Sequence, residues 1–368
     1  MASPRRSSRP SKRPRIVVLG GGFAGLAAAQ TLRADRFDVT LVDQRRAFEW
    51  LPNIHELLSG VKRPEDLRLP LDELVRRAGH RFVRDAVVAI DPEARAIIPR
   101  RRKLPLPYDA LIVACGGVDA TRGVAGVREH AHGFKSVEEC DRIGRRLARL
   151  GKRRRPAEVV IVGGGLEGVE ALGEILRRPD AANLHVTLVE AGPRLLAEAP
   201  ASLDRHVRAL CADDAVVFET NAPVARIEAD AVVLADGRTR PTDLTIWTGG
   251  PAPPDLLAAS RLAPADAWAA VDRTLQSKDH PEIFVAGDAA ELPTPLARQG
   301  YHALDMGRCA AANAMRQRDD RPLRAFRPSE KPMLIAFGDR STFLVAGKRV
   351  LAGLPLASAK EAVFEVVL

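Results

Sequence analysis

Two glycine motifs of identical spacing are the residues of this 368-residue chain best suited to do chemistry. GGGFAG occupies residues 20–25 and GGGLEG occupies residues 163–168, and each follows a continuous apolar run. In the spacing GxGxxG, the first glycine permits a tight turn, the second lets the backbone approach a pyrophosphate, and the third lets a helix pack on a strand. The N-terminus of that helix offers free N–H groups and a partial positive charge to phosphates. The chain is therefore predicted to contain two dinucleotide sites.

An acidic residue completes each motif. Asp43 follows the predicted strand 39–42, and Glu190 follows the predicted strand 186–189. A carboxylate in this place accepts hydrogen bonds from ribose hydroxyls, and it repels a 2′-phosphate. Glu190 thus favours NADH over NADPH, although Arg194 nearby could accommodate the phosphate, so NADPH stays open.

The elements that must position these residues also occur twice. Each copy is expected to hold a strand, a helix, a second strand, an antiparallel hairpin and a closing strand. The first copy has strands at 15–19 and 39–42, a helix to about Ala34, a hairpin at 81–98 and a closing strand at 108–114. The second has strands at 158–162 and 186–189, a helix at 169–178, a hairpin at 215–234 and a closing strand at 242–247.

A later segment supplies one more element. Residues 281–288 predict a short buried strand ending in Gly287 and Asp288, and a helix is expected from about Leu296 to Met315. A Gly-Asp pair after a strand is an ordinary turn when it stands alone. Its place after two nucleotide units makes it a candidate cofactor contact.

Composition excludes several other classes of protein. Six arginines and lysines in residues 1–15 supply most of the net charge of +9, and aromatic residues are only 4% of the chain. Nucleic-acid binding is not expected, because such surfaces interleave basic and aromatic residues. Four scattered cysteines exclude a disulfide scaffold and a zinc site, and a reducing compartment is the plain interpretation. Three consecutive glycines within the uncharged run 16–32 argue against a membrane helix, and the lack of a convincing small-residue cleavage site after it argues against a signal peptide.

The order of these motifs resembles the two-dinucleotide-domain flavoprotein oxidoreductases. In that family the first unit and the Gly-Asp strand bind FAD, and an inserted second unit binds NAD(P)H. The resemblance implies an α/β fold with two Rossmann-like domains of the three-layer ββα type, the NAD domain inserted in the FAD domain, and a small C-terminal α+β segment. The expected parts are a disordered basic tail at 1–14, an FAD-binding domain at 15–120 and 251–322, an NAD(P)H-binding domain at 121–250, and a C-terminal interface segment at 323–368.

Within this superfamily the chain is most similar to type II NADH dehydrogenases and their apoptosis-inducing-factor-like relatives. No cysteine precedes Cys115, so the CxxxxC of glutathione-reductase-type enzymes is absent. Residues 52–60 resemble a segment that runs past the flavin, and residues 326–347 and 360–365 resemble the C-terminal sheet and a Lys-containing helix near the quinone. One departure is residues 297–303, ARQGYHA, where those enzymes usually have A-Q-x-A-x-Q-Q.

The resemblance also implies site residues. Three are expected to act in catalysis: Glu170, Pro52 and Lys360. The cofactor-binding residues implied by the first unit and the Gly-Asp strand are Gly20, Gly22, Phe23, Ala24, Gly25, Asp43, Gln44, Val87, Ala114, Cys115, Gly116, Gly287, Asp288 and Ala297. Those implied by the second unit are Gly163, Gly165, Leu166, Glu167, Gly168, Glu190 and Gly249. Glu170 has a second interpretation, an acid in the first helical turn that meets the helix dipole.

The function that follows from the resemblance is an FAD-dependent NADH dehydrogenase, in which hydride passes to flavin N5 and electrons pass on to a quinone or another small acceptor. Two alternatives stay open: an NADH-responsive redox sensor with little turnover, and an enzyme similar to sulfide:quinone oxidoreductases. The expected partners are NADH and an electron acceptor, with no metal and no nucleic acid. The expected location is the cytoplasm, where peripheral contact with the cytoplasmic membrane face stays open. A homodimer also stays open.

Overall fold

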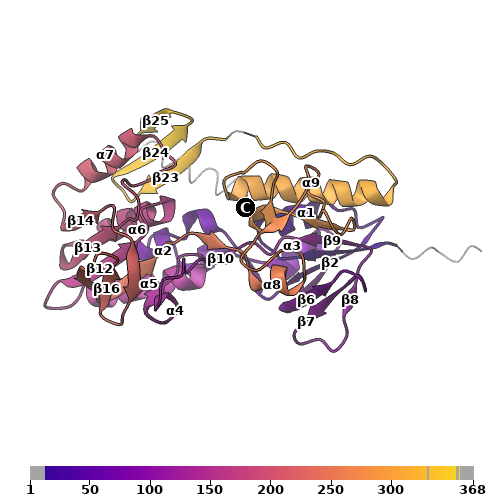
Figure 1. Cartoon of the computed structure of the whole chain (residues 1–368), viewed down its shortest axis with the longest axis horizontal. Helices are drawn as coiled ribbons and strands as arrows, with labels where there is room; N and C mark the ends of the chain where they lie inside the picture. The colour runs from indigo at the N-terminus through magenta and orange to yellow at the C-terminus, as the bar shows by residue number, and fades with distance from the viewer. Residues whose placement is uncertain (1–12, 330, 354–355, 357–368) are drawn as a thin grey trace, which may run out of the picture. The chain divides into compact units, whose positions relative to one another are not determined.

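The computed structural model describes residues 13–329, 331–353 and 356. Their packing divides the chain into two compact units. Described residues of the first unit are 13–48, 69–117 and 252–329, and those of the second are 49–68, 118–251 and the residues from 331 onward. Each unit is built around its own parallel sheet, coloured from indigo to orange by residue number in Figure 1.

The sheet of the first unit has five parallel strands in the order β21-β9-β1-β2-β5. Its strands are β1 (Arg15–Leu19), β2 (Asp38–Asp43), β5 (Arg81–Arg84), β9 (Ala110–Val113) and β21 (Ile283–Val285). Strands β21, β9, β1 and β2 are mostly apolar and almost entirely buried, as expected when both faces of a parallel sheet are covered.

Helices and a small antiparallel sheet supply the other layers of this unit (Figure 1). The helices are α1 (Phe23–Thr31), α3 (Leu71–Arg77), α8 (Asp255–Ala259) and α9 (Gly300–Arg318), and the small sheet holds β6 (Val87–Asp91), β7 (Ala96–Pro99) and β8 (Leu106–Pro107). The helices α1 and α9 pack closely: a Cβ added to Gly307 would lie 2.0 Å from the carbonyl oxygen of Ala24. Only glycine allows this approach of the two helices.

The second unit repeats the plan, with the parallel order β11-β18-β12-β13-β14. Its strands are β11 (Ala131–His132), β12 (Ala157–Val162), β13 (Leu184–Val189), β14 (Val216–Glu219) and β18 (Leu244–Trp247), with a small sheet of β15 (Val224–Ile227), β16 (Ala231–Leu234) and β17 (Thr239–Pro241). Its helices are α2 (Glu56–Ser59), α4 (Val127–His130), α5 (Val137–Leu150), α6 (Leu166–Leu176) and α7 (Ala201–Leu210).

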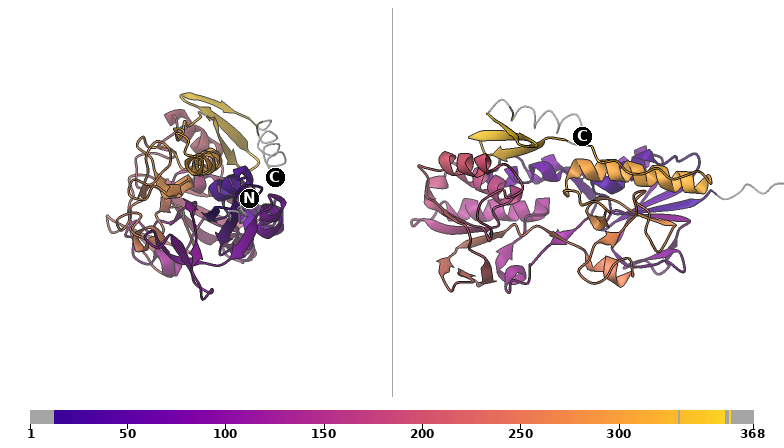
Figure 2. Two further views of the ribbon diagram at one scale, coloured as in Figure 1. Left: turned by 90° about the vertical axis from the view of Figure 1, so that its right-hand side faces the viewer. Right: turned by 45° about the horizontal axis from the view of Figure 1, so that its top comes forward.

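A C-terminal antiparallel sheet belongs to the second unit, and Figure 2 shows it in yellow. It consists of β23 (Met333–Phe337), β24 (Ser341–Ala346) and β25 (Arg349–Ala352). It packs on α6 at Gly173, where a Cβ would lie 2.6 Å from the nitrogen of Gly338. The remaining short elements are β3 (Ala47–Glu49), η1 (Leu51–Asn53), η2 (Pro64–Leu67), β4 (Arg68–Pro70), β10 (Val118–Asp119), η3 (Ala181–Asn183), β19 (Pro251–Ala252), β20 (Ala269–Ala270), η4 (Gly287–Ala289) and β22 (Ala290–Glu291).

The internal repeat extends to single hydrogen bonds. At the start of the first sheet, the backbone N–H of Arg15 donates to Asp109 Oδ2 at 2.7 Å. In the second sheet, the N–H of Glu158 donates to Asp243 Oδ2 at 3.1 Å. Both aspartates directly precede the closing strand, β9 or β18, so an equivalent side chain in each unit connects this strand to the one before the glycine motif, β1 or β12.

Several predicted boundaries are wrong. Residues 81–84 and 216–219 were expected in antiparallel hairpins, but each forms the edge strand of a parallel sheet, and the hairpin begins one strand later. Helix α1 ends at Thr31, and α9 starts at Gly300 rather than near Leu296. Alternation alone does not reveal the partner of an edge strand, because a half-buried strand has the same pattern in either sheet.

Candidate functional site

The first glycine motif forms a tight turn in which two of the glycines cannot be replaced, because neighbouring backbone atoms occupy the space of a side chain. Gly20 has φ +101°, and a Cβ there would lie 2.2 Å from the carbonyl oxygen of Ala114. A Cβ on Gly25 would lie 1.8 Å from the carbonyl oxygen of Gly20. Gly22 differs, because no described heavy atom lies within 4 Å of its Cβ position. Two glycines are therefore required by packing, and the third faces open space.

The second motif has the same geometry. Gly163 has φ +113°, and its Cβ position lies 2.6 Å from the carbonyl oxygen of Thr248, the counterpart of Ala114. A Cβ on Gly168 would lie 1.9 Å from the carbonyl oxygen of Gly163, whereas Gly165 again has no described atom within 4 Å. The two turns thus leave equivalent spaces beside the N-termini of α1 and α6.

The acidic residues hold these turns from the neighbouring strand. Asp43 Oδ2 accepts a hydrogen bond from the N–H of Gly21 at 2.7 Å. Glu190 Oε2 accepts from Gly164 at 2.6 Å, and its Oε1 accepts from Gly192 at 2.7 Å. Each carboxylate is thereby fixed at the edge of its turn, where the ribose next to a bound pyrophosphate would lie.

These features fit a dinucleotide in each unit. In the described structure no side chain caps the N-terminus of α1 or α6, since the capping positions are Gly22 and Gly165. Uncapped N–H groups beside an open space are the donors that a pyrophosphate needs. The glycines, Asp43 and Asp288 would hold FAD in the first unit, and the second glycine set with Glu190 would hold NADH.

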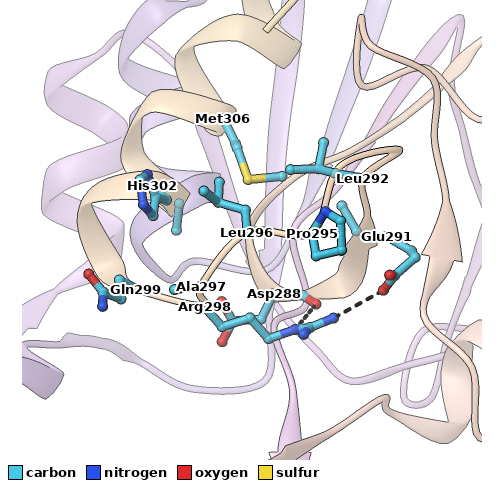
Figure 3. Close-up of a pocket in the computed structure, with 13 residues that line it drawn as sticks. Asp288, Glu291, Leu292, Pro295, Leu296, Ala297, Arg298, Gln299, His302 and Met306 are labelled. Atoms are coloured by element: carbon cyan, nitrogen blue, oxygen red, sulfur yellow. Dashed lines mark hydrogen bonds and ion pairs between the residues drawn. The ribbon is translucent and has the colours of Figure 1, made fainter. Parts of the chain in front are cut away.

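Asp288 lies in the turn η4, which follows β21, and a pocket opens beside this turn (Figure 3). Gly287 has φ +71° and packs against Ala24 of α1, where its added Cβ would meet Ala24 Cβ at 3.1 Å. Ala297 lines the same pocket, but it precedes α9 instead of lying in it. The structure therefore brings the Gly-Asp turn beside α1, the helix that follows the first glycine motif.

The other predicted cofactor-binding residues of the first unit lie in a helix, a strand and loops. Phe23 begins α1, and its ring packs edge-on against Phe48 with centroids 5.0 Å apart. The carbonyl oxygen of Gln44 accepts from Arg84 Nε at 3.3 Å. Val87 is the first residue of β6, and Gly116 has φ +67°. Their roles toward a cofactor remain predictions.

Cys115 follows the closing strand, and burial raises the pKa of its thiol to about 12. Burial likewise raises the pKa of Cys309 to about 11 and that of Cys211 to about 12. All four cysteines lie among the described residues, and each is a free thiol. Since the thiolate is the reactive form, this environment does not favour redox chemistry at these sulfur atoms.

The second unit contains a buried polar cluster that includes Glu170. His55 is 1% exposed, and its Nε2 lies 3.5 Å from Glu170 Oε1 while its Nδ1 lies 3.9 Å from Glu174 Oε1. Glu170 Oε1 also accepts from the N–H of Ala336 in β23 at 3.1 Å, and Ser59 Oγ donates to Glu174. Glu170 lies in the second turn of α6, which weakens the interpretation as a first-turn acid meeting the helix dipole.

Of the remaining predicted residues, Pro52 is exposed in η1, next to this cluster in sequence. Glu167 forms an ion pair with Lys135, and Leu166 begins α6. The carbonyl oxygen of Gly249 accepts from Arg122 Nε at 2.8 Å. Lys360 lies outside the described residues, as does most of the segment 354–368.

Sequence reasoning missed several members of these sites. Glu174 was recognisable as an acid four residues after Glu170, because that spacing puts both on one helix face. Asn53 Oδ1 accepts a hydrogen bond from Trp50 Nε1 at 2.9 Å, and Asn53 Nδ2 donates to Glu56 Oε2 at 3.1 Å. No local signal predicted this part of the cluster, since its members are ordinary loop residues until the fold buries them.

Asp119, near the Lys135–Glu167 pair, carries a pH-dependent prediction. Burial and the nearby Glu139 raise its pKa to about 7. A carboxyl whose pKa is raised in the folded state stabilises the fold below its unfolded pKa, and this contribution is lost as pH rises to about 7. We expect Asp119→Asn to raise Tm at pH 8 by a few degrees and to have little effect at pH 4.5. Thermal denaturation at both pH values checks this, with Asp236→Asn on the surface as the control.

No described helix is long and apolar enough to cross a membrane. Among the described residues, no group of three His, Cys, Asp or Glu side chains could hold a metal ion.

Comparison with known proteins defines the class. A profile of the pyridine nucleotide-disulphide oxidoreductase family matches residues 14–317, so the chain belongs to this family. Membership confirms the expected fold, the enzyme class and the two cofactors: the protein is an FAD-dependent oxidoreductase that uses NADH.

Individual relatives and solved structures that are similar to this chain include quinone reductases. Demethylphylloquinone reductase NdbB of Synechocystis is 28% identical over 76% of this chain and 72% of its own length. A type II NADH:quinone oxidoreductase of Staphylococcus aureus is 25% identical over 97% of this chain and 94% of its own length. Among solved structures, NDH2 of Plasmodium falciparum in complex with NADH has a TM-score of 0.86 at 16% identity, covering 96% of this chain and 94% of that one. The sulfide:quinone oxidoreductase of Aquifex aeolicus has a TM-score of 0.83 at 23% identity, covering 96% and 90%.

Proposed function

We propose that this protein is an NADH dehydrogenase that passes electrons from NADH through FAD to a quinone or a similar small acceptor. The observation that carries the proposal is the pair of equivalent glycine turns, each with an open second glycine and a fixed acid. The relatives named as quinone reductases support the acceptor class. FAD, when bound, accepts hydride from reduced nicotinamide and gives electrons to the acceptor.

The chain's own residues bind and orient. Gly22 and Gly165 leave room for the two pyrophosphates, and the N–H groups of α1 and α6 neutralise them. Asp288 would hold the ribityl chain of FAD. Glu170 would contact the nicotinamide end of NADH, with its carboxylate oriented by Ala336 and His55.

The preference for NADH over NADPH is supported by two side chains. Glu190 presents a carboxylate that repels a 2′-phosphate. Arg194, which could have bound that phosphate, instead donates to the carbonyl oxygens of Leu196 at 2.9 Å and Ala197. The guanidinium is therefore already occupied by the backbone of its own loop.

Replacement of Glu190 by glutamine tests this preference. The amide keeps the size of the side chain but removes the negative charge and one acceptor for a loop N–H. We expect the ratio of kcat/KM for NADH to that for NADPH to fall about tenfold, as removal of a repulsion of about 1–2 kcal/mol predicts. Steady-state kinetics with both nucleotides measure it. Asp43→Asn, at the equivalent place in the first turn, should leave the ratio unchanged; an unaltered ratio in Glu190→Gln removes this residue from the proposal.

The experiment that tests the proposed function is anaerobic titration of the purified protein with NADH, followed by addition of menadione. Bleaching of a flavin spectrum by NADH, rapid reoxidation by menadione and steady turnover are the expected results. Slow reduction with a long-lived coloured complex would instead support the redox-sensor alternative. Turnover with sulfide in place of NADH would favour the sulfide:quinone alternative, against which the raised pKa values of the cysteine thiols already argue.

A further inference from the structure

Arg298 contacts Asp288 and Glu291 through its guanidinium group, as Figure 3 shows, and the same group stacks on Trp268. Its Nε donates to the carbonyl oxygen of Asp288 at 3.2 Å, and its Nη2 lies 3.3 Å from Glu291 Oε2. Its Cζ lies 3.9 Å above the ring centroid of Trp268. The side chain is 28% exposed, so these contacts form at a partly shielded surface beside the pocket.

The three partners belong to one small substructure. Trp268 directly precedes β20, and Glu291 ends β22, which pairs with β20 in parallel through Ala269–Ala290 and Ala270–Glu291. Asp288 lies in the turn η4 that leads into β22. Two-stranded pairings this short have little stability of their own. Arg298 precedes α9, and its side chain therefore stabilises the turn η4 and the strands β20 and β22 through contacts from a separate segment.

The hydrogen bond from Arg298 determines which part of Asp288 is held in place. Arg298 donates to the main-chain oxygen of Asp288, so it sets the orientation of the peptide bond that follows Asp288. Guanidinium is suited to this because its planar fork can stack on an aromatic ring while its edges donate hydrogen bonds. Lysine has no planar group to stack on the ring, and its three donors share a single nitrogen.

We propose that Arg298 is a positioning residue for FAD: it holds the 287–289 turn in the geometry that presents the Asp288 carboxylate to the cofactor. This inference rests on the proposed role of Asp288 in FAD binding and adds a residue that acts through it. The open second glycine binds the pyrophosphate, and the fastened turn orders the second contact before the cofactor arrives. Such preorganisation raises affinity by lowering the ordering cost of binding.

Titration of deflavinated protein with FAD, followed by flavin fluorescence, tests the proposal without relying on turnover. We expect Arg298→Met to raise the Kd for FAD about tenfold, the effect of losing a hydrogen bond from a charged group. Arg298→Lys should restore little of the affinity, and Glu291→Gln should raise Kd in the same direction by a smaller factor. Arg308→Met is the matched control, since Arg308 lies within α9 and forms an ion pair with Asp305.

A double variant separates positioning from general stability. Asp288→Ala removes the carboxylate and keeps the carbonyl oxygen that Arg298 contacts. If Arg298 acts through Asp288, Arg298→Met combined with Asp288→Ala binds FAD no more weakly than Asp288→Ala alone. Additive losses, or wild-type affinity in Arg298→Met, overturn the proposal. An unchanged Kd in Asp288→Ala alone would instead refute the proposed role of Asp288, so the two failures are distinguishable.

Discussion

Gly22→Val should yield a folded protein that no longer retains flavin, whereas Gly25→Ala should fail to fold. The two residues lie in one motif, but their surroundings differ. A side chain on Gly22 enters a space with no described atom within 4 Å, so the apo fold tolerates it, and it occupies the place expected for the pyrophosphate. A single methyl on Gly25 would lie 1.8 Å from a backbone oxygen that cannot move without breaking the turn.

Both expected effects are large, but Gly22→Val affects flavin binding and Gly25→Ala affects folding. Gly22→Val should keep the circular dichroism and the apo Tm of the wild type while flavin occupancy after purification falls at least tenfold, because the backbone loses its close approach to the phosphates. Gly25→Ala should be recovered mainly as insoluble protein, since the overlap forces helix and strand apart. Absorbance at the flavin band and thermal denaturation measure both effects.

The second unit offers an internal control for this pair. Gly165→Val should keep FAD but raise KM for NADH strongly, and Gly168→Ala should destabilise the fold as Gly25→Ala does. If Gly22→Val retains FAD with wild-type affinity, the first turn does not hold a pyrophosphate and the assignment of the two units fails.

The glycine pair also shows what sequence could predict. The glycine spacing, together with the strand before it and the acid after it, predicted both turns and the parallel strands around them, because these features are local and occur twice. The family resemblance, rather than any residue pattern, assigned FAD to the first unit and NADH to the second.

The parts that sequence did not predict depend on distant contacts. The edge strands β5 and β14 were predicted in hairpins because the alternation of their side chains does not indicate which strand pairs with them. Arg298 was noted only as a departure from a glutamine, and its contacts with Trp268 and Glu291 exist only once β20 and β22 pair. His55 lies in the segment 52–60, and its two carboxylate neighbours are more than a hundred residues away in the chain.

His55→Leu should destabilise the protein by about 3–5 kcal/mol, the cost of removing one partner from a buried charged network. Glu170 and Glu174 lie one turn apart on the buried face of α6, and their side chains are 10% and 1% exposed. Two carboxylates at this spacing repel each other when both are ionised. An imidazole between them can donate to one carboxylate, and an imidazolium can donate to both. Arg177, whose Nη1 lies 3.5 Å from Glu174 Oε1, compensates only the second.

Thermal denaturation checks this expectation, and a second substitution identifies its cause. His55→Leu should lower Tm by roughly 10 °C, given a few degrees per kcal/mol for domains of this size. Adding Glu174→Gln should recover part of the loss, because it removes one of the two charges that the leucine cannot satisfy. His185→Gln, which breaks an exposed pair with Glu158 at 3.2 Å, should change Tm by no more than about 1–2 °C. A His55→Leu variant as stable as the wild type would show that the histidine does not stabilise the two carboxylates.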